Sequence, residues 1–322
     1  MRVSVIATVR NEEASIADLL TTRQEQTRQP DEIIICDGGS GDRTVEILRS
    51  WVQRGLPLHV IEAPHTNIAQ GRNRAIAAAS GEIIASTDAG VRLSPRWLDE
   101  LTAPFASPQA PDVVGGFFIA DAHNAFETAM GATVLPALAD IRPAQFLPSS
   151  RSVAFRKSAW QAVGGYPEWL DYCEDLVFDF ALRRAGFRFA FAPDAIVYFR
   201  PRPDLRAFFQ QYYRYARGDG KANLWPKRHA VRYLTYILAP LVMALGLRYT
   251  ILWVGLALAG LAYCWRPYQR LWPHLRAYGP RTRLYALALV PLIRFVGDVA
   301  KMIGYPVGLW CRLTRHRRSE MT

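Results

Sequence analysis

Strand-like runs alternate with helix-like segments through the first 87 residues, and this alternation restricts the chain to few folds. The runs expected as strands are residues 3–9, 32–36, 58–61 and 82–87, and the helices expected between them are residues 15–26, 42–51 and 70–79. We expect the hydroxyl of Ser15 to cap the first helix. Strands and helices that alternate at this spacing form βαβ units, so the sequence predicts an α/β fold with a largely parallel sheet.

The pattern continues less regularly to about residue 200. Further strands are expected at residues 113–120, 152–155 and 187–197, and further helices at 97–105, 157–163 and 175–185. Residues 121–150 are rich in Ala and punctuated by Pro, and they could form a pair of helices over the site. About 200 residues of this kind can bury a core without disulfides.

Carboxylates follow the expected strands at three places. Asp37 and Asp88 each end a strand, and the pair Glu174–Asp175 follows an irregular segment. In an open α/β sheet, ligands bind beyond the carboxyl ends of the strands. Acidic side chains collected there suit a metal ion, a ribose and a proton acceptor, which favours an enzyme that acts on nucleotide-linked substrates.

Two loops near the start of the chain are candidate nucleotide contacts. Residues 8–13, with Thr8, Arg10 and Glu12, could hold a base through backbone groups, or could form a plain turn whose acids favour a helix N-terminus. Asp37 and the Gly-rich loop after it could bind a base N–H or a ribose hydroxyl. The alternative is an Asp/Gly turn in which Asp42 caps the next helix.

The next two motifs carry opposite charges. Arg72 and Arg74 could reach a diphosphate, or could be solvated helix charges. Asp88 could hold a divalent cation together with substrate phosphates, although Gly90 stands where a second carboxylate would help. A polar turn at the strand end is the alternative interpretation of Asp88.

Two later motifs are ambiguous when each is taken alone. Asp175, or its neighbour Glu174, could remove a proton from an attacking hydroxyl, or both acids could stabilise a helix N-terminus. Gln211, Arg214 and Tyr215 lie shortly before the apolar region. An aromatic stripe that packs against the sheet domain would explain them as well.

The C-terminal third differs in charge and hydropathy. Residues 201–322 contain 20 Lys and Arg against 4 Asp and Glu, whereas the whole chain has a net charge of +11. Basic residues that flank apolar helices indicate the anionic cytoplasmic leaflet. A nucleic-acid patch is disfavoured because the Arg residues interleave with Leu, Trp and Tyr, so no nucleic-acid partner is expected.

Two apolar stretches lie in this third. Residues 233–265 are nearly uninterrupted, and a single helix of 33 residues would reach roughly 50 Å against a hydrocarbon core of about 30 Å. Two short spans that turn near Arg248, or a re-entrant hairpin, fit better. Residues 284–311 contain Pro291 and Pro306 as well as charges, and could be an interfacial helix or a functional span. A buried helical domain of a soluble protein is the alternative for both stretches.

The domain organisation follows from these features. We expect a catalytic domain at residues 1–205, an amphipathic segment at 206–232 and a membrane-associated helical region at 233–322. Arg-rich loops bound the apolar stretches, which places the catalytic domain on the cytoplasmic side of the inner membrane. Four scattered Cys without metal-binding or disulfide spacing fit a reducing compartment. The N-terminal apolar run is too short for a signal peptide.

Six motifs in this order resemble the family 2 glycosyltransferases of the GT-A fold, in particular membrane-associated bacterial members. They are the Asn-Glu-Glu start, the Asp-Gly-Gly-Ser loop, the Gly-Arg-Asn helix, the Asp-Ala-Gly turn, the Glu-Asp pair and the Gln-x-x-Arg-Tyr segment. The resemblance covers about residues 1–220. It implies a GT-A sheet flanked by helices, transfer of a sugar from a nucleotide donor, usually with inversion, and use of Mg²⁺ or Mn²⁺.

The same resemblance assigns roles to single residues. Asp37 would contact the nucleoside, Asp88 the metal and the diphosphate, and Asp175 would be the base. The segment from Gln211 to Tyr215, with Arg214, is similar to the Gln-x-x-Arg-Trp motif of membrane-bound synthases, with Tyr in place of Trp. Gly90 replaces the second Asp of the usual Asp-x-Asp, which makes metal dependence less secure.

The sequence therefore predicts an inverting glycosyltransferase at the cytoplasmic face of the membrane. Its acceptor would be a hydroxyl of a lipid, a lipid-linked sugar or a saccharide. Synthases of long polymers usually carry membrane spans before the sheet domain as well, and no such span is expected before residue 3 here. A single or short transfer is therefore favoured over processive polymerisation. A nucleotidyltransferase and a non-catalytic membrane scaffold are the alternatives. The nucleotidyltransferase is disfavoured because that class favours a Gly-rich, Lys-containing phosphate loop after the first strand, where this chain has Arg10 to Glu13.

Overall fold

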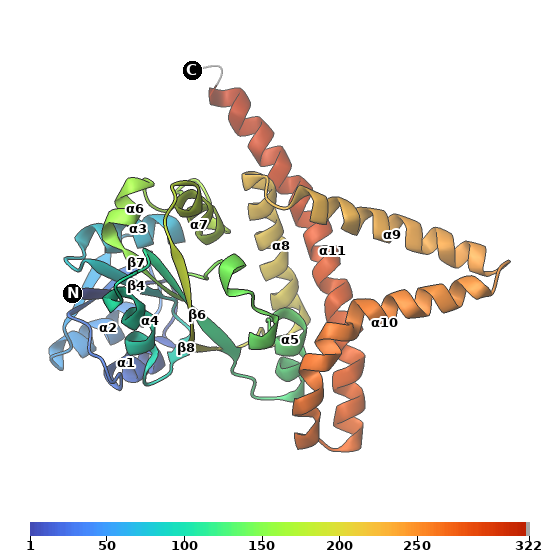
Figure 1. The fold of residues 1–322 in the computed structure, drawn as a ribbon, viewed down its shortest axis with the longest axis horizontal. Coiled ribbons are helices and arrows are strands. Elements are labelled where there is room, and N and C mark those ends of the chain that lie inside the picture. The colour runs from blue at the N-terminus through green and yellow to red at the C-terminus, as the bar shows by residue number, and fades with distance from the viewer. Residues whose placement is uncertain (320–322) are drawn as a thin grey trace. The chain divides into compact units, whose positions relative to one another are not determined.

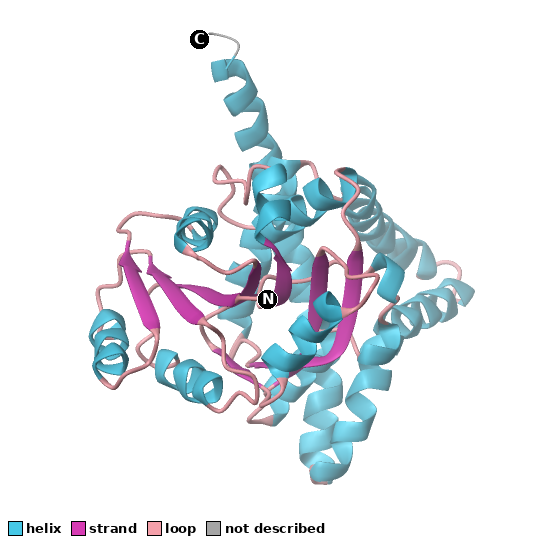
Figure 2. Ribbon diagram, turned by 60° about the vertical axis from the view of Figure 1, so that its left-hand side comes forward, coloured by secondary structure: helices cyan, strands magenta, loops and turns pink. Residues whose placement is uncertain are grey.

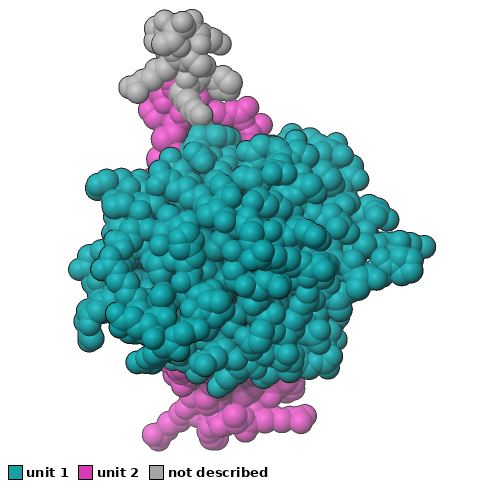
Figure 3. Space-filling model, turned by 90° about the vertical axis from the view of Figure 1, so that its left-hand side faces the viewer, with its two compact units in different colours: residues 1–121, 138–200 teal, residues 122–137, 201–322 magenta. Residues whose placement is uncertain are grey.

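The computed structural model describes residues 1–319 (Figure 1). The chain divides into two compact units, coloured separately in Figure 3. Unit 1 comprises residues 1–121 and 138–200, and unit 2 comprises residues 122–137 and 201–322.

Unit 1 is built on one mixed sheet of eight strands in the order β3-β2-β1-β4-β7-β6-β8-β5. The strands are β1 (Val3–Val9), β2 (Glu32–Asp37), β3 (Leu58–Glu62), β4 (Ile83–Thr87), β5 (Val91–Leu93), β6 (Val113–Ala120), β7 (Ser152–Arg156) and β8 (Phe189–Phe199). Strand β1 pairs in parallel with both β2 and β4, and β2 with β3, so this part of the sheet is parallel, as the βαβ pattern predicts. The pairs β4–β7, β6–β7 and β5–β8 are antiparallel, which makes the sheet mixed.

Helices cover both faces of this sheet (Figure 2). In unit 1 they are α1 (Ile16–Gln24), α2 (Thr44–Gln53), α3 (Ile68–Ala78), α4 (Trp97–Thr102), α6 (Lys157–Ala162) and α7 (Glu174–Arg184), with short 3-10 turns at Ala103–Ala106, Leu138–Asp140 and Pro143–Gln145. Buried side chains of α1, α2 and α4 pack against one face of the sheet, and those of α3, α6 and α7 against the other. This is the flanked α/β sheet that the sequence predicts.

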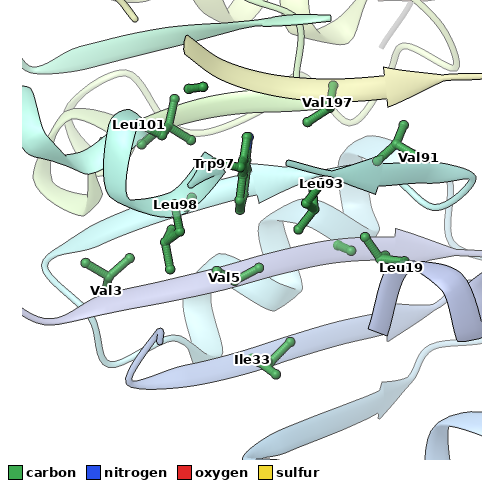
Figure 4. Close-up of a cluster of buried hydrophobic side chains, with 14 of the residues drawn as sticks. Val3, Val5, Leu19, Ile33, Val91, Leu93, Trp97, Leu98, Leu101 and Val197 are labelled. Atoms are coloured by element: carbon green, nitrogen blue, oxygen red, sulfur yellow. The ribbon is translucent and has the colours of Figure 1, made fainter. Parts of the chain in front are cut away.

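Alternation along the strands explains the core on the first face. Val3 and Val5 of β1 point to the same side, where Leu98 of α4 meets them (Figure 4). Trp97 fills the centre of this layer and is fully buried, and its indole N–H donates to Ser152 Oγ at 2.9 Å. A buried indole N–H needs such a partner.

Some local expectations were wrong. Ser15 does not cap α1, because its hydroxyl donates back to the Glu12 carboxylate and carbonyl instead of accepting a helix N–H. Residues 121–150 contain one α-helix, α5 (Ala125–Val134), and not a helix pair. Prolines at 136, 143 and 148 break the remainder into short turns. The short strand β5 was not foreseen, because three residues carry too little periodicity.

Unit 2 is helical. Besides α5 it contains α8 (Leu205–Ala222), α9 (Pro226–Gly246), α10 (Ile251–Leu271), a 3-10 turn at Trp272–Ala277 and α11 (Pro280–Ser319). Helices α8 and α11 lie side by side (Figure 1). They approach so closely that a Cβ at Gly304 or Gly308 would lie 2.3 or 2.1 Å from a carbonyl oxygen of α8. Glycine is therefore required at both positions.

Helix α11 runs through Pro291 and Pro306 without a break. Each Pro lacks an N–H and frees the carbonyl four residues earlier. The carbonyl freed by Pro291 accepts a bond from the Tyr268 hydroxyl at 3.3 Å, and the one freed by Pro306 accepts from the Tyr233 hydroxyl at 2.7 Å. Tyrosines of α10 and α9 thus replace both lost hydrogen bonds, and the helix continues.

The apolar stretch at 233–265 folds as two helices, α9 and α10, which meet at residues 247–250, where a turn near Arg248 was predicted (Figure 1). Large apolar side chains along both helices are exposed, among them Val231, Leu247 and Ile251. Of the helices within residues 1–319, α9 alone has the length and hydropathy to cross a membrane. Unburied apolar surface of this extent marks an interaction with protein or lipid.

Candidate active site

The loops that follow β1 and β2 are fastened to each other. Asn11, in a left-handed conformation with φ of 56°, accepts from Gly41 N at 2.8 Å, and its own N–H donates to Ser40 Oγ at 2.8 Å. The N–H of Glu12 donates to Thr44 Oγ1 at 2.8 Å. Because β1 and β2 are parallel neighbours, both loops leave the same edge of the sheet. Residues 10–13 and 38–42 therefore form one surface.

Asp37 lies at the end of β2 and is buried. Its carboxylate accepts the N–H groups of Gly39 and Ser40, each at 2.9 Å, and the Ser40 hydroxyl. These bonds turn the loop, as Asx motifs do. The carboxylate thus has a structural task in this loop, and its contact with a nucleoside stays a prediction.

Arg72 is the centre of the cluster beyond β4. Helix α3 can approach β1 closely because residue 71 is Gly, where a Cβ would lie 2.9 Å from Thr8 Cγ2. The Arg72 side chain is 3% exposed. Its Nη1 donates to Glu174 Oε1 at 2.5 Å and its Nη2 to Asp88 Oδ1 at 2.7 Å. One buried guanidinium therefore joins a carboxylate at the end of β4 to one at the start of α7.

The charges in this cluster depend on one another. Burial alone would lower the pKa of Arg72, but Asp88 and Glu174 more than reverse that effect and raise it. Burial raises the pKa of the Glu174 carboxyl, and Arg72 opposes the rise. Removal of one partner from a buried ion pair of this kind strongly destabilises the fold, because the other charge is left buried without a partner.

Asp175 stands beside this ion pair in the first turn of α7. Cys173, just before the helix, adopts a left-handed conformation with φ of 64°. Asp175 Oδ1 accepts from Leu176 N at 2.8 Å, and Oδ2 has no hydrogen bond within the described residues. Burial raises the pKa of the Asp175 carboxyl, while Arg72 lowers it. A partly buried carboxylate with a raised pKa and an available oxygen suits a general base.

Arg151 was not recognised from the sequence. It precedes β7, whose antiparallel register sets Ser152 opposite Thr87 and so brings Arg151 beside Asp88. Its Nε lies 3.9 Å from Asp88 Oδ2 and is buried without a hydrogen-bond partner in the described chain. A single Arg before a strand carries no sequence signal, and only the strand pairing reveals it.

Family comparisons now identify the chain. The profile described as "Glycosyl transferase family 2" matches residues 4–160, and the one described as "Glycosyl transferase family group 2" matches residues 83–296. The protein belongs to glycosyltransferase family 2. Between them the two profiles cover every residue of the cluster described above.

Relatives of this glycosyltransferase include O-antigen chain rhamnosyltransferases. RfbN of Salmonella typhimurium is 24% identical over 226 residues, which cover 66% of this chain and 71% of RfbN. WbaN of Salmonella anatum is 27% identical over 203 residues, which cover 59% of this chain and 63% of WbaN.

Solved structures support the fold. The mannosyltransferase PcManGT from Pyrobaculum calidifontis, in complex with GDP-Man and Mn²⁺, has a TM-score of 0.57 and 19% identity, covering 97% of this chain and 87% of its own. S. aureus TarS 1–349 has a TM-score of 0.51 and 18% identity, covering 99% and 92%. At these identities the likeness establishes the GT-A fold of this glycosyltransferase and not its substrates.

The glycosyltransferase collects four of the expected site residues in one cluster. Arg72, Asp88, Glu174 and Asp175 come from α3, the end of β4 and the start of α7. Arg72 and Glu174 are 102 residues apart in the chain. The cluster unites the positions to which the sequence assigned the diphosphate, the metal and the base.

The other expected residues belong to other elements. Thr8 is in β1 against α3, and Arg10 is exposed in the loop that follows. Gln211 and Tyr215 belong to α8 of unit 2, where the Gln211 amide donates to the Tyr215 hydroxyl at 2.8 Å. Arg214, exposed, is on the same helix. The pairing at positions i and i+4 orders this motif within α8.

A divalent cation can be fitted to this site only through few protein ligands. Asp88 Oδ1 is taken by Arg72, and Oδ2 makes no hydrogen bond within residues 1–319. No three His, Cys, Asp or Glu side chains of the described chain group around a cation position. One carboxylate oxygen plus substrate phosphates and water is a common Mg²⁺ arrangement, so Asp88 fits a cation that arrives with its donor.

Gly90 leaves room near a second acid. With φ of 74°, it turns the chain between β4 and β5, and a Cβ placed there would lie 3.8 Å from Glu12 Oε2. Glu12 is therefore an acidic side chain close to the position of the missing second Asp. Its proximity gives the Asn-Glu-Glu loop a possible ligand for a cation, in addition to its backbone groups.

Asp179 is a further buried acid that sequence reasoning missed. It lies one turn after Asp175 on α7, and its Oδ2 is buried without a hydrogen-bond partner in the described residues. Burial, and then the neighbouring Asp175, raise the pKa of Asp179 well above its ordinary value. Its position on the inner face of an amphipathic helix was the available signal.

Proposed function

We propose that this glycosyltransferase moves a sugar from a nucleoside diphosphate donor to a hydroxyl of a saccharide or lipid-linked acceptor, with inversion at the anomeric carbon. The observation that carries the proposal is the Arg72 guanidinium, which ties Asp88 on the donor side to Glu174 beside Asp175. Arg72 thereby fixes the position of Asp88 relative to the start of α7, where Asp175 lies, within unit 1.

The transfer follows from these residues. Asp175 accepts the proton of the acceptor hydroxyl through its available oxygen, and the acceptor oxygen bonds to the anomeric carbon as the bond to the diphosphate oxygen breaks. The nucleoside diphosphate leaves from the opposite side, which inverts the configuration. Arg151, whose Nε lies beside Asp88 without a hydrogen-bond partner in the described residues, would stabilise charge on the leaving diphosphate.

Asp88, with Glu12 as the second acid, would hold Mg²⁺ or Mn²⁺ when the donor is bound, and the cation would neutralise diphosphate charge. Calorimetry of Mn²⁺ binding in the presence of nucleoside diphosphate tests this part. Asp88→Asn should weaken Mn²⁺ binding strongly and Glu12→Gln measurably, whereas Asp99→Asn, at an exposed site on α4, should leave it unchanged. Full activity of the wild type in EDTA would exclude the metal role.

The relatives guide the choice of substrates. RfbN and WbaN are named O-antigen chain rhamnosyltransferases, and PcManGT was solved with GDP-Man. We therefore expect a hexose or deoxyhexose donor and a growing saccharide as acceptor. The exposed apolar helices α9 and α10 support an acceptor that is lipid-linked and an enzyme held at the cytoplasmic face of the membrane.

A panel of nucleotide-activated rhamnose, mannose and N-acetylglucosamine, offered with lipid-linked saccharide from membranes, tests the reaction. We expect release of nucleoside diphosphate that depends on the acceptor and on one donor. Release of pyrophosphate would indicate a nucleotidyltransferase instead. Failure of every donor, with the protein folded and binding none, would refute the proposal.

A further inference from the structure

Helix α11 carries a row of charged side chains within unit 2. Arg294, Asp298 and Lys301 stand at positions i, i+4 and i+7, so they share one face of the helix. Asp298 is only 8% exposed. Its carboxylate accepts from Arg232 Nε at 2.7 Å and from the hydroxyls of Tyr236 and Tyr263. Asp298 is therefore satisfied, and Arg232 neutralises its charge.

Arg294 has no carboxylate partner within the described residues. Pro267 of α10 frees the carbonyl of Tyr263, and Arg294 Nη2 donates to that oxygen at 2.9 Å while the guanidinium lies over the Tyr263 ring at 3.9 Å. Its Nε is buried and makes no hydrogen bond in the described chain. One bond to a neutral carbonyl leaves most of the donors of this cation unused.

Lys301 also has no anionic partner at bonding distance in residues 1–314. Its ammonium lies 4.8 Å from the centre of the Tyr212 ring, within electrostatic reach of Arg232, Arg294 and Asp298. Asp219, the other acid in reach, lies 3.2 Å from His229. Arg232 balances Asp298, and Arg294 and Lys301 add two further positive charges to the cluster, of which Asp219 opposes one.

Exposed apolar surface lies beyond this cluster, along α9 and the turn that follows it. Arg232 lies near the start of α9, and the helix continues for about 20 Å beyond it to the turn at Leu247. That length exceeds half of a hydrocarbon core of about 30 Å. Leu247 is 83% exposed and Ile251 72%. A hairpin that inserts this apolar end into one leaflet holds the cationic cluster near the level of the lipid phosphates.

We propose that Arg294 and Lys301, positioned by Asp298 and Arg232, form a binding site for the phosphate group of an anionic membrane lipid. A phosphate monoester carries a charge of about −1.5 to −2 near pH 7, so it can pair with both the Arg294 guanidinium and the Lys301 ammonium. Its acyl chains would lie along the exposed apolar side chains of α9 and α10. This activity is separate from sugar transfer and involves residues of unit 2 alone.

Binding of the full-length protein to vesicles tests the proposal without donor or acceptor. Vesicles of phosphatidylcholine are compared with vesicles that also contain phosphatidic acid. Native mass spectrometry then counts the phosphatidic acid molecules that stay bound to the protein after it is released from the vesicles. We expect tighter binding to the phosphatidic acid vesicles and one retained molecule. Arg294→Gln with Lys301→Gln should reduce that affinity by at least tenfold.

The matched control removes the same charge elsewhere. Arg276→Gln with Arg281→Gln neutralises two exposed cations of the same unit, and should lower the affinity no more than threefold. Lys301→Gln alone, which breaks no hydrogen bond, guards against misfolding and should still lose retained lipid. Equal losses in both double variants would overturn the site, and displacement of the lipid by equimolar inorganic phosphate would overturn its assignment to a lipid.

Discussion

Replacement of Arg72 by Met should destabilise unit 1 where α3, β4 and α7 meet. Methionine keeps much of the volume and removes the charge. The Glu174 carboxylate, whose side chain is 7% exposed, then loses its counter-charge, while the Asp88 side chain, at 26%, can be partly hydrated. Breaking a buried ion pair in this way typically costs about 3–5 kcal/mol, and we expect that range for Arg72→Met.

Hydrogen exchange measured by mass spectrometry reports this loss locally. A loss of about 3 kcal/mol corresponds to roughly a hundredfold faster exchange when opening is the limiting equilibrium. Peptides from α3, β4 and α7 should show it, whereas peptides of α8 and α11 in unit 2 should exchange as in the wild type. The exchange rate of Arg72→Lys should lie between those of the wild type and Arg72→Met, because a single ammonium cannot reproduce both hydrogen bonds that the guanidinium makes to Glu174 and Asp88.

The loss should also depend on pH. Without Arg72, the pKa of the buried Glu174 rises further, so the folded state takes up a proton as the pH falls and recovers part of its stability. The defect is therefore larger at about pH 8 than at about pH 5.

Arg43→Met is the matched control. Arg43 pairs with Glu46 at 3.2 Å, but both side chains are about 70% exposed. An exposed pair contributes about 0–1 kcal/mol, so exchange should barely change. If Arg72→Met behaves like Arg43→Met, the buried ion pair does not hold this cluster together.

Three further predictions concern the acids of α7 and the apolar hairpin. Asp175→Asn should reduce turnover by roughly 10²- to 10⁴-fold and leave donor affinity within a few-fold, since a base acts in the transition state. Because burial raises the pKa of Asp175, the acid limb of the kcat/KM profile should lie above pH 3.8. A limb at or below pH 3.8, or a mutant with wild-type turnover, would remove Asp175 from the mechanism. The stability of Asp179→Asn relative to the wild type should increase as the pH rises above 3.8, because a buried acid whose pKa is raised in the folded state destabilises the fold once it loses its proton. Thermal unfolding of both proteins at a series of pH values above 3.8 measures this difference. A difference that does not change with pH contradicts the prediction. The full-length protein should stay on membranes in molar salt and dissolve in detergent. A chain ending near Lys227 should be far more soluble and keep donor binding, but should lose activity on a lipid acceptor. Complete release of the full-length protein by salt would show that only surface charge attaches it to the membrane.

The strand and helix order of unit 1 could be predicted because it is written in local periodicity. The runs at 3–9 and 32–36 are β-branched and pair as parallel neighbours in β1 and β2. Their ends bring acidic side chains to one edge of the sheet, as the position of Asp37 and Asp88 in the sequence suggested. The family resemblance rests on the same local motifs, and the comparisons confirm it.

The partners of these acids could not be predicted, because they depend on long-range packing. Arg72 looked like a diphosphate ligand or a solvated charge, yet it is buried between Asp88 and Glu174. Arg151 comes beside Asp88 only through the antiparallel register of β7 on β4. Neither spacing nor composition encodes that register.

The continuity of α11 could not be predicted for a similar reason. Pro291 and Pro306 end helices in isolation, because each removes a hydrogen bond. In this protein Tyr268 and Tyr233 supply replacement donors from other helices, so α11 continues. A sequence window along α11 contains no sign of these partners.

The anomeric configuration of the product tests most directly whether the sugar is transferred in a single displacement with Asp175 as base. Once the donor panel has identified the sugar, proton NMR of the transferred residue gives its configuration relative to the donor. A single displacement with Asp175 as base predicts inversion in the wild type, and product formation slower by roughly 10²- to 10⁴-fold in Asp175→Asn, because Asp175 acts directly on the acceptor hydroxyl. Retention of configuration would contradict it, since a single displacement with Asp175 as base cannot give that outcome.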